Sequence, residues 1–180
     1  MSFNKYRKIL FLKISNIWIV FLFLIIVSAC GYKFTGGGSF PAGIKRICVA
    51  ILENRTSETG AENIFTNDLI YEITRDNKVV LTNKDKADAL LSGVIKSINI
   101  KTISRTGTHS SLERRVTVTV DIKLTTLDGK VLWSEDNVEA NEAYDVRSDK
   151  LVTEQQRRNA ISALSKRLAQ RLYARLTDDF

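Results

Sequence analysis

The first residue in the chain that could do chemistry is Cys30, which follows the small residue Ala29 and precedes Gly31. A cysteine after an apolar run and a small residue is the pattern cut by the lipoprotein signal peptidase, and its thiol then accepts a diacylglycerol. We expect residues 1–29 to be a signal peptide and Cys30 to be the lipid-bearing N-terminus, with palmitate or similar acyl chains. Such chains hold a protein firmly on a membrane. Position 31 is Gly rather than Asp, which resembles the pattern of bacterial lipoproteins that are delivered to the outer membrane by default.

The residues before Cys30 support this interpretation. Residues 1–13 contain four basic residues and no acidic one, and an unbroken apolar run follows at 17–27. A transmembrane helix needs about 20 apolar residues, so this run is short for a span. The alternative is a retained membrane anchor, which would require the run to extend backwards through Lys13, Ser15 and Asn16. A cleaved lipoprotein leader is the better interpretation.

Other reactive residues give no support to an enzyme. Cys48 lies in the apolar run 47–51, which predicts a buried, inert thiol. His109 is the only histidine and has no cysteine or carboxylate at metal-ligand spacing. The pair Glu135 and Asp136 fits a solvated edge, and no glycine motif precedes a helix in the manner of a phosphate site. We therefore expect no catalytic residue, no metal and no cofactor.

Composition excludes one further class. The chain has 27 basic and 20 acidic residues, but cleavage before Cys30 would remove four basic residues and leave a net charge of about +3. Nucleic-acid binding thereby loses its main support. Cys48 would be the only unmodified thiol, so we expect no disulfide within the mature chain.

Turn residues and hydrophobic periodicity predict the organisation of the mature chain. Residues 30–43 contain Gly36-Gly37-Gly38 and Pro41-Ala42-Gly43, which indicates a flexible tether before a single domain at 44–180. The expected strands are 44–52, 90–103, 116–125 and 131–133, with a short extended piece at 79–82. The expected helices are 60–76 and a long one that begins at a Thr153 and Gln156 capping box and continues to Leu176.

The clearest strand is 116–125, where valines and other apolar residues alternate strictly with threonine, aspartate and lysine. In the preceding segment, Val94, Ile98 and Ile100 are expected to share one face, although Ile95 and Ile103 break the alternation. Asp128-Gly129 predicts a tight hairpin turn to the next strand. These patterns indicate an α+β sandwich with the helices on one side of a largely antiparallel sheet.

Several segments, in this order, resemble the lipopolysaccharide-assembly lipoprotein family (LptE). They are Cys30-Gly31-Tyr32-Lys33-Phe34, Phe40-Pro41-Ala42-Gly43-Ile44-Lys45, Asn54-Arg55-Thr56, Ala87-Asp88-Ala89-Leu90-Leu91-Ser92-Gly93, the strand at 116–120, Gly129-Lys130-Val131-Leu132-Trp133 and the helix around Ala160. The resemblance implies an α+β fold of two helices packed on one face of a mainly antiparallel or mixed four-stranded sheet. It also implies a partner, the outer-membrane β-barrel LptD, which such proteins plug and help to assemble for delivery of lipopolysaccharide to the cell surface. The mature domain would then be periplasmic or lie within the barrel lumen.

Lipopolysaccharide presents phosphates, which arginine and lysine bind well. The candidate lipopolysaccharide-binding residues are Arg105, Arg114, Arg115 and Lys123, with Lys101 on an adjoining polar surface. Arg105 is the first choice because its loop, 104–113, is expected to be long and exposed. The alternative is that these are ordinary solubilising charges.

Two other functions stay open beside the barrel plug. One is a free periplasm-facing lipoprotein that binds a small or lipidic ligand, and the other is an envelope enzyme, for which no catalytic constellation is found. The basic face of the last helix is expected to meet solvent or the barrel rather than lipid. Its arginines are Arg157, Arg167, Arg171 and Arg175.

Overall fold

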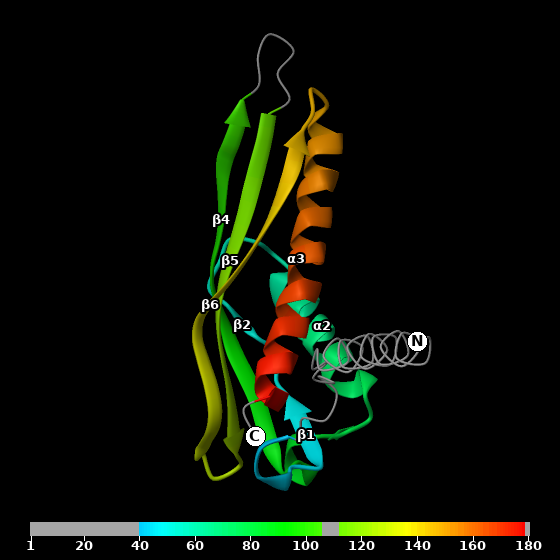
Figure 1. Cartoon of the computed structure of the whole chain (residues 1–180), viewed down its shortest axis with the longest axis vertical. Helices are drawn as coiled ribbons and strands as arrows, with labels where there is room; N and C mark the ends of the chain where they lie inside the picture. The colour runs from blue at the N-terminus through cyan, green and yellow to red at the C-terminus, as the bar shows by residue number, and fades with distance from the viewer. Residues whose placement is uncertain (1–39, 106–111, 179–180) are drawn as a thin grey trace, which may run out of the picture. The chain divides into compact units, whose positions relative to one another are not determined.

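The computed structural model describes residues 40–105 and 112–178, and the expected signal peptide, Cys30, Gly31 and His109 lie outside these ranges. The elements, shown in Figure 1, are η1 (Pro41–Gly43), β1 (Arg46–Val49), β2 (Glu53–Asn54), α2 (Ala61–Arg75), β3 (Val80–Leu81), η2 (Lys84–Lys86), β4 (Ala89–Arg105), β5 (Leu112–Thr126), β6 (Val131–Val146) and α3 (Lys150–Asp178).

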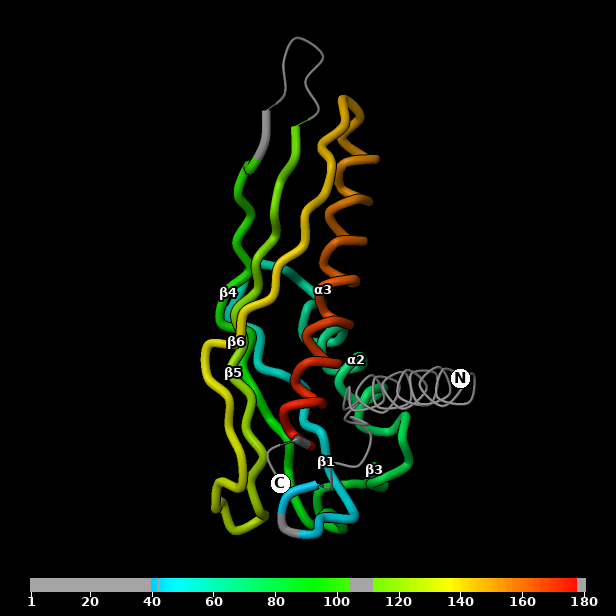
Figure 2. The backbone as a smooth tube through the Cα atoms, in the orientation of Figure 1, coloured from blue at the N-terminus to red at the C-terminus, as the bar shows by residue number. Residues whose placement is uncertain are grey.

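One mixed sheet with two helices on one face makes up the fold. Its strand order is β3-β1-β4-β5-β6, with β2 paired to β4. The pairs of β1 with β3, β1 with β4 and β2 with β4 are parallel, whereas β4–β5 and β5–β6 are antiparallel. The expected α+β class is confirmed, with α2 and α3 on the same side of the sheet (Figures 1 and 2). The sheet has six strands rather than four because β2 and β3 add two residues each.

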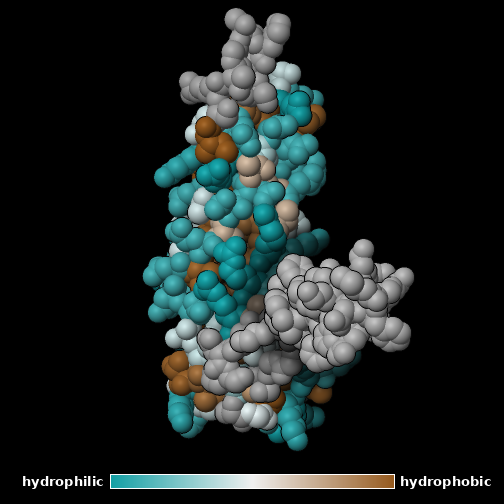
Figure 3. All heavy atoms as spheres, in the orientation of Figure 1, coloured by the Kyte–Doolittle hydropathy of each residue, from teal (hydrophilic) through white to brown (hydrophobic). Residues whose placement is uncertain are grey.

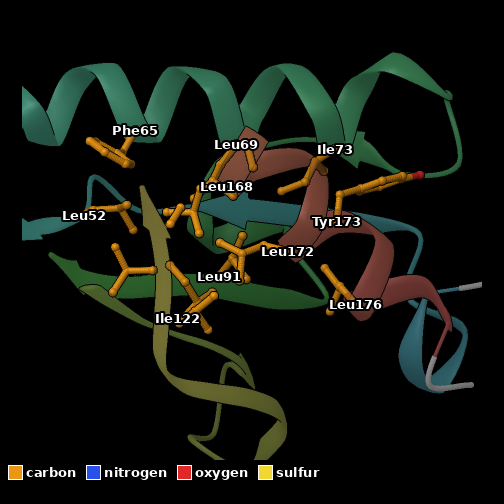
Figure 4. Close-up of a cluster of buried hydrophobic side chains, with 14 of the residues drawn as sticks. Leu52, Phe65, Leu69, Ile73, Leu91, Ile122, Leu168, Leu172, Tyr173 and Leu176 are labelled. Atoms are coloured by element: carbon orange, nitrogen blue, oxygen red, sulfur yellow. The ribbon is translucent and has the colours of Figure 1, made fainter. Parts of the chain in front are cut away.

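Strand β5 supplies the centre of the core. Its even-numbered residues from Val116 to Leu124 are buried under the helices, and the odd-numbered residues point to the opposite face. Leu168 and Leu172 of α3, together with Phe65 and Leu69 of α2, pack against this row from above (Figure 4). The strict alternation along β5 therefore fixes which face of the sheet the helices cover.

Two β-bulges at one level of the sheet change the expected register. Lys96 is an extra residue in β4, and Asp136 and Asn137 of β6 together oppose Asp121 of β5. The Lys96 ammonium lies 3.1 Å from Asp121 and donates to Asn137 Oδ1 at 2.8 Å, while the Asn137 N–H donates to Asp121 Oδ1 at 2.7 Å. Partial burial raises the pKa of Asp121, but these bonds outweigh it and lower the pKa overall. The Asp121 carboxylate thus joins both bulges.

The bulge at Lys96 makes one prediction wrong. Val94 pairs with Asp121 on the face opposite the helices, whereas Ile98 pairs with Val118 on the helix face. An extra residue reverses the alternation, so Val94 and Ile98 do not share a face. The extra residue at Asn137, whose φ is 55°, reverses the alternation of β6 in the same way, so most of this strand shows no continuous period-two hydrophobicity.

β6 runs thirteen residues beyond the expected 131–133 and forms one edge of the sheet. Arg167, Arg171 and Arg175, spaced one turn apart on α3, reach this edge. Arg171 donates to the carbonyl of Glu139 at 2.8 Å, Arg175 pairs with Glu135 at 2.9 Å, and Arg167 pairs with Glu142. These arginines are part-exposed, but they contact the protein's own edge strand rather than solvent alone. They occupy backbone groups that an open edge would offer to another chain.

Polar side chains set where both helices begin. The Asn54 amide donates to the Glu58 carbonyl and to Glu62, each at 2.8 Å, and so ties the loop before α2 to its first turn. The expected capping box at Thr153 is wrong, because Asp149 accepts the Leu151 N–H at 2.7 Å and caps α3 four residues earlier. Arg157 pairs with Glu154 and Glu58, which raises its pKa and joins α3 to the loop before α2.

Asp88 connects the starts of β1 and β4. Its Oδ2 accepts the N–H groups of Lys45 and Arg46 at 3.2 and 2.9 Å, and its Oδ1 accepts the Arg46 guanidinium at 2.6 Å. These hydrogen bonds, from the Arg46 side chain above all, lower the pKa of Asp88 from 3.8 to about 2.

We expect Asp88→Asn to destabilise the domain in a pH-dependent way. Because the folded pKa is depressed, the stabilising contribution of the carboxylate is complete above about pH 3.8 and is lost as the pH falls through about 2. The difference in Tm between the wild type and Asp88→Asn should be constant near neutrality and shrink between pH 4 and pH 2, as followed by circular dichroism. Asp85→Asn, an exposed aspartate in η2, is the control. An equal Tm loss in that control would contradict this role for Asp88.

Candidate functional site

The face of β4, β5 and β6 away from the helices is polar, and no described element covers it; we call it the bare face. Thr117, Thr119, Asp121, Lys123 and Thr125 of β5 run along its centre. At Thr119 a chain of hydroxyl contacts crosses the strands, from Ser97 Oγ at 3.3 Å to Glu139 Oε1 at 3.5 Å. A face of this kind suits contact with another polar surface better than contact with lipid.

Two positive side chains lie directly opposite each other on the bare face. Lys101 of β4 and Arg115 of β5 are register partners, and both are exposed. Like charges across a strand pair destabilise a sheet. Within residues 40–105 and 112–178, neither has an ion pair or a side-chain hydrogen bond. The pair is available to bind an anion, and the repulsion between its two charges lowers the stability of the fold.

The other expected binding residues do not form one cluster with this pair. Arg105 ends β4 and pairs with Leu112, so the expected loop 104–113 is shorter at both ends than predicted. Arg114 points to the helix face, opposite Thr102 and Tyr144, and is half-buried. Lys123 shares the face of Arg115 but lies eight residues along β5, roughly 26 Å away.

Lys123 instead lines a separate hollow of about 410 Å³ in the sheet near the bulges. Arg55 lines it from the loop after β2, and Asp121 and Asp136 contribute negative charge. Arg55 also pairs with Glu53 at 2.8 Å, a bond that lowers the pKa of Glu53. Residue spacing gives no sign of Arg55, because the pairing of β2 with β4 and the bond from the Arg55 N–H to Ile95 O bring it beside β4. The mixed charge suits hydrogen bonding to a polar partner rather than a simple anion.

Gly93 of β4 also lines this hollow. A Cβ at Gly93 would lie 2.5 Å from the Asp121 carbonyl oxygen and would also meet the Ile122 side chain. Only glycine permits that approach of β4 to β5.

Metal and membrane signals are lacking in the described part of the chain. Its histidine, cysteine and carboxylate side chains form no group of three that could hold a metal ion. None of the helices in the two described ranges is long and apolar enough to cross a membrane. Cys48, expected to be buried, is half-buried on β1.

Comparison with protein families matches residues 44–176 to the model of the LptE lipopolysaccharide-assembly family. That match covers β1 to nearly the end of α3, and so includes Lys101, Arg105, Arg114, Arg115 and Lys123. A comparison with curated protein sequences gave no match.

Solved lipoprotein structures share the fold at low sequence identity. Rare lipoprotein B from Shewanella oneidensis has 13% identity and a TM-score of 0.53, with 75% of this chain and 96% of that chain covered. Lipoprotein B from Nitrosomonas europaea has 14% identity and a TM-score of 0.51, covering 83% and 92%. A minor lipoprotein from Acinetobacter baumannii has 15% identity and a TM-score of 0.50, covering 75% and 92%.

We expect Arg115→Glu to stabilise the domain, because it replaces a repulsive pair with an attractive one opposite Lys101. The gain should be about 0.2–1 kcal/mol in the free energy of unfolding, measured with urea. Lys123→Glu is the matched control, since it makes the same charge change on the same strand and face but lies opposite Ser92 and Ser134. Equal effects of the two substitutions would show that the Lys101 and Arg115 pair carries no special repulsion.

Proposed function

Because the chain belongs to the LptE lipopolysaccharide-assembly family, we propose that it is a lipid-anchored outer-membrane protein that plugs and helps to assemble the lipopolysaccharide-export barrel LptD. The family match over residues 44–176 carries this proposal. The family consists of assembly lipoproteins without catalytic activity, in agreement with the expectation that the chain is not an enzyme. Lipidation of Cys30 and cleavage before it are part of the proposal.

The bare face supports contact with a barrel lumen. The interior of a large outer-membrane barrel is polar, and the central row of the bare face consists of threonines with a few charges. When side chains of this kind meet a lumen wall, their hydrogen bonds to water are replaced by hydrogen bonds to the wall, so the cost in free energy is small. The rigid sheet behind them gives the plug a fixed shape.

The alternative of a free lipoprotein with a lipid-binding core has less support. The space among Leu52, Phe65, Val120, Leu168 and Leu172, between the helices and the sheet, has no room for even a water molecule. An acyl chain would have to separate α3 from β5 to enter there.

Purification of the lipidated protein from its native outer membrane in mild detergent should recover one large β-barrel at equal stoichiometry. A Thr117→Arg/Thr119→Arg variant, which crowds the bare face, should recover much less barrel than the wild type. The control Gln170→Arg/Ala174→Arg, on the exposed face of α3, should recover more barrel than that variant. The readout is the ratio of the two proteins by quantitative mass spectrometry. A solitary monomer from a membrane that contains intact LptD would refute the plug, and equal losses in both variants would refute the role of the bare face.

We propose further that the exposed Lys101 and Arg115 pair binds lipopolysaccharide phosphates, with Arg105 near the same end of β4 and β5. Arg114, on the opposite face of the sheet, would bind a different phosphate group. Lys123 would bind separately at its hollow.

Neutralising the pair with Lys101→Gln/Arg115→Gln should weaken binding of lipopolysaccharide to the purified protein roughly a hundredfold or more, since it removes two charge-assisted hydrogen bonds of about 1.5–3 kcal/mol each. The matched control, Arg158→Gln/Lys166→Gln, removes two charges from exposed positions on α3. Binding can be followed by co-precipitation with immobilised lipopolysaccharide. If both double variants weaken binding equally, these side chains are ordinary solubilising charges.

A further inference from the structure

One end of the domain combines exposed apolar and basic side chains. It is formed by the β5–β6 turn, η1, the start of β1 and η2, and we call it the turn end. A hollow lined by Ile44 and Lys45 on one side and by Thr126 and Leu132 on the other joins η1 and β1 to the hairpin. The Asp88 N–H, just after η2, donates to the Arg46 carbonyl at 2.9 Å. Figures 1 and 2 show these elements together at the lower end of the sheet.

Two large apolar side chains at the turn end are about half exposed. Leu127 is 47% exposed and Val131 is 53% exposed. The turn is held by backbone bonds between Thr126 and Lys130 and by Gly129, whose φ is +92°. Polar residues would serve such a turn equally well. Figure 3 shows hydrophobic side chains at this end, and others farther up the molecule.

The charges around these apolar residues are mainly positive. Lys45, Lys84, Lys86 and Lys130 are exposed there, against Asp85 and Asp128. Arg46 and Asp88 form an ion pair with each other. Apolar side chains ringed by lysines suit the headgroup region of an anionic lipid leaflet, where the lysines meet phosphate and the apolar groups enter the acyl boundary.

Chain length determines which end of the domain can reach the anchoring leaflet. Phe40 is buried against Tyr173, with ring centroids 6.1 Å apart, and leads directly into η1. Cys30 is ten residues before Phe40, so the intervening chain spans at most about 35 Å. The far end of β5 is 15 residues from the turn, roughly 50 Å away. The turn end is therefore the part of the sheet closest to the lipid.

We propose that the turn end docks on the anionic lipid leaflet that holds the anchor, with Leu127 and Val131 at the acyl boundary. The proposal rests on the proposed lipidation of Cys30 and concerns the chain on a bilayer without its barrel. Docking holds the long strands upright from the membrane and presents the Lys101 and Arg115 pair away from it.

The test uses the full lipidated chain with Cys48→Ser, reconstituted in vesicles of phosphatidylethanolamine and phosphatidylglycerol. An environment-sensitive fluorophore is attached at Leu127→Cys, and in a separate sample at Thr102→Cys near the far end of β4. Emission at position 127 should shift to the blue and be quenched by spin-labelled lipid roughly threefold more than emission at position 102. Lys84→Glu/Lys130→Glu, or vesicles of phosphatidylcholine alone, should reduce that difference.

Equal quenching at both positions would overturn the proposal. Shielding of position 127 that depends on protein concentration and not on the lipid quencher would assign this end to a second copy of the chain, and would also overturn it. Mass spectrometry of the same sample establishes whether Cys30 is acylated. Because the vesicles contain no barrel, a failure here is distinct from a failure to recover LptD.

Discussion

The burial of only one face of the sheet is the constraint on which the rest of this structure depends. The even-numbered residues of β5 from Val116 to Leu124 are almost fully buried beneath α2 and α3, and their odd-numbered neighbours point to the bare face. A shift of one residue in the pairing of β5 would bring threonine, aspartate and lysine under the helices, at several kcal/mol for each unpaired polar group. The register is therefore strongly fixed, and with it the composition of the surface left for a partner.

The sequence predicted the elements whose hydrophobic period stays constant. The α2 helix, the alternation of β5 and the turn at Gly129 are confirmed, since each depends on local spacing or on a positive φ. The far half of β6 was missed, because the bulge at Asn137 reverses the period and the segment is rich in glutamate and asparagine. Periodicity cannot reveal a bulge stabilised by Lys96 and Asp121, which lie on two other strands.

The charged residues of the candidate site could be predicted from the sequence, but the face of the sheet on which each one lies could not. Arg114 and Arg115 are adjacent in sequence and point to opposite faces of the sheet, so the two cannot bind one phosphate from the same side. Lys101 lies opposite Arg115 because of the number of bulges between this pair and the end of the sheet where the β5–β6 turn lies. Two bulges interrupt the pairing of β4 with β5, at Lys96 and at Ile103, and the one at Lys96 lies on the turn side of the pair. Without it, Lys101 would lie on the helix face.

The bare face is poorly suited to a domain that works alone, and this argues for a partner. The edge of β6 is occupied by arginines from α3, so the protein protects that edge with its own side chains. Among the described elements, nothing comparable covers the threonines of β5 or separates the like charges of Lys101 and Arg115, whose repulsion reduces the stability of the isolated sheet. A residue pair that weakens the fold and has no partner within it is explained most simply by a ligand or a protein that supplies the missing negative charge. The proposed barrel and its lipopolysaccharide cargo would supply a polar wall for the threonines and phosphates for the two cations.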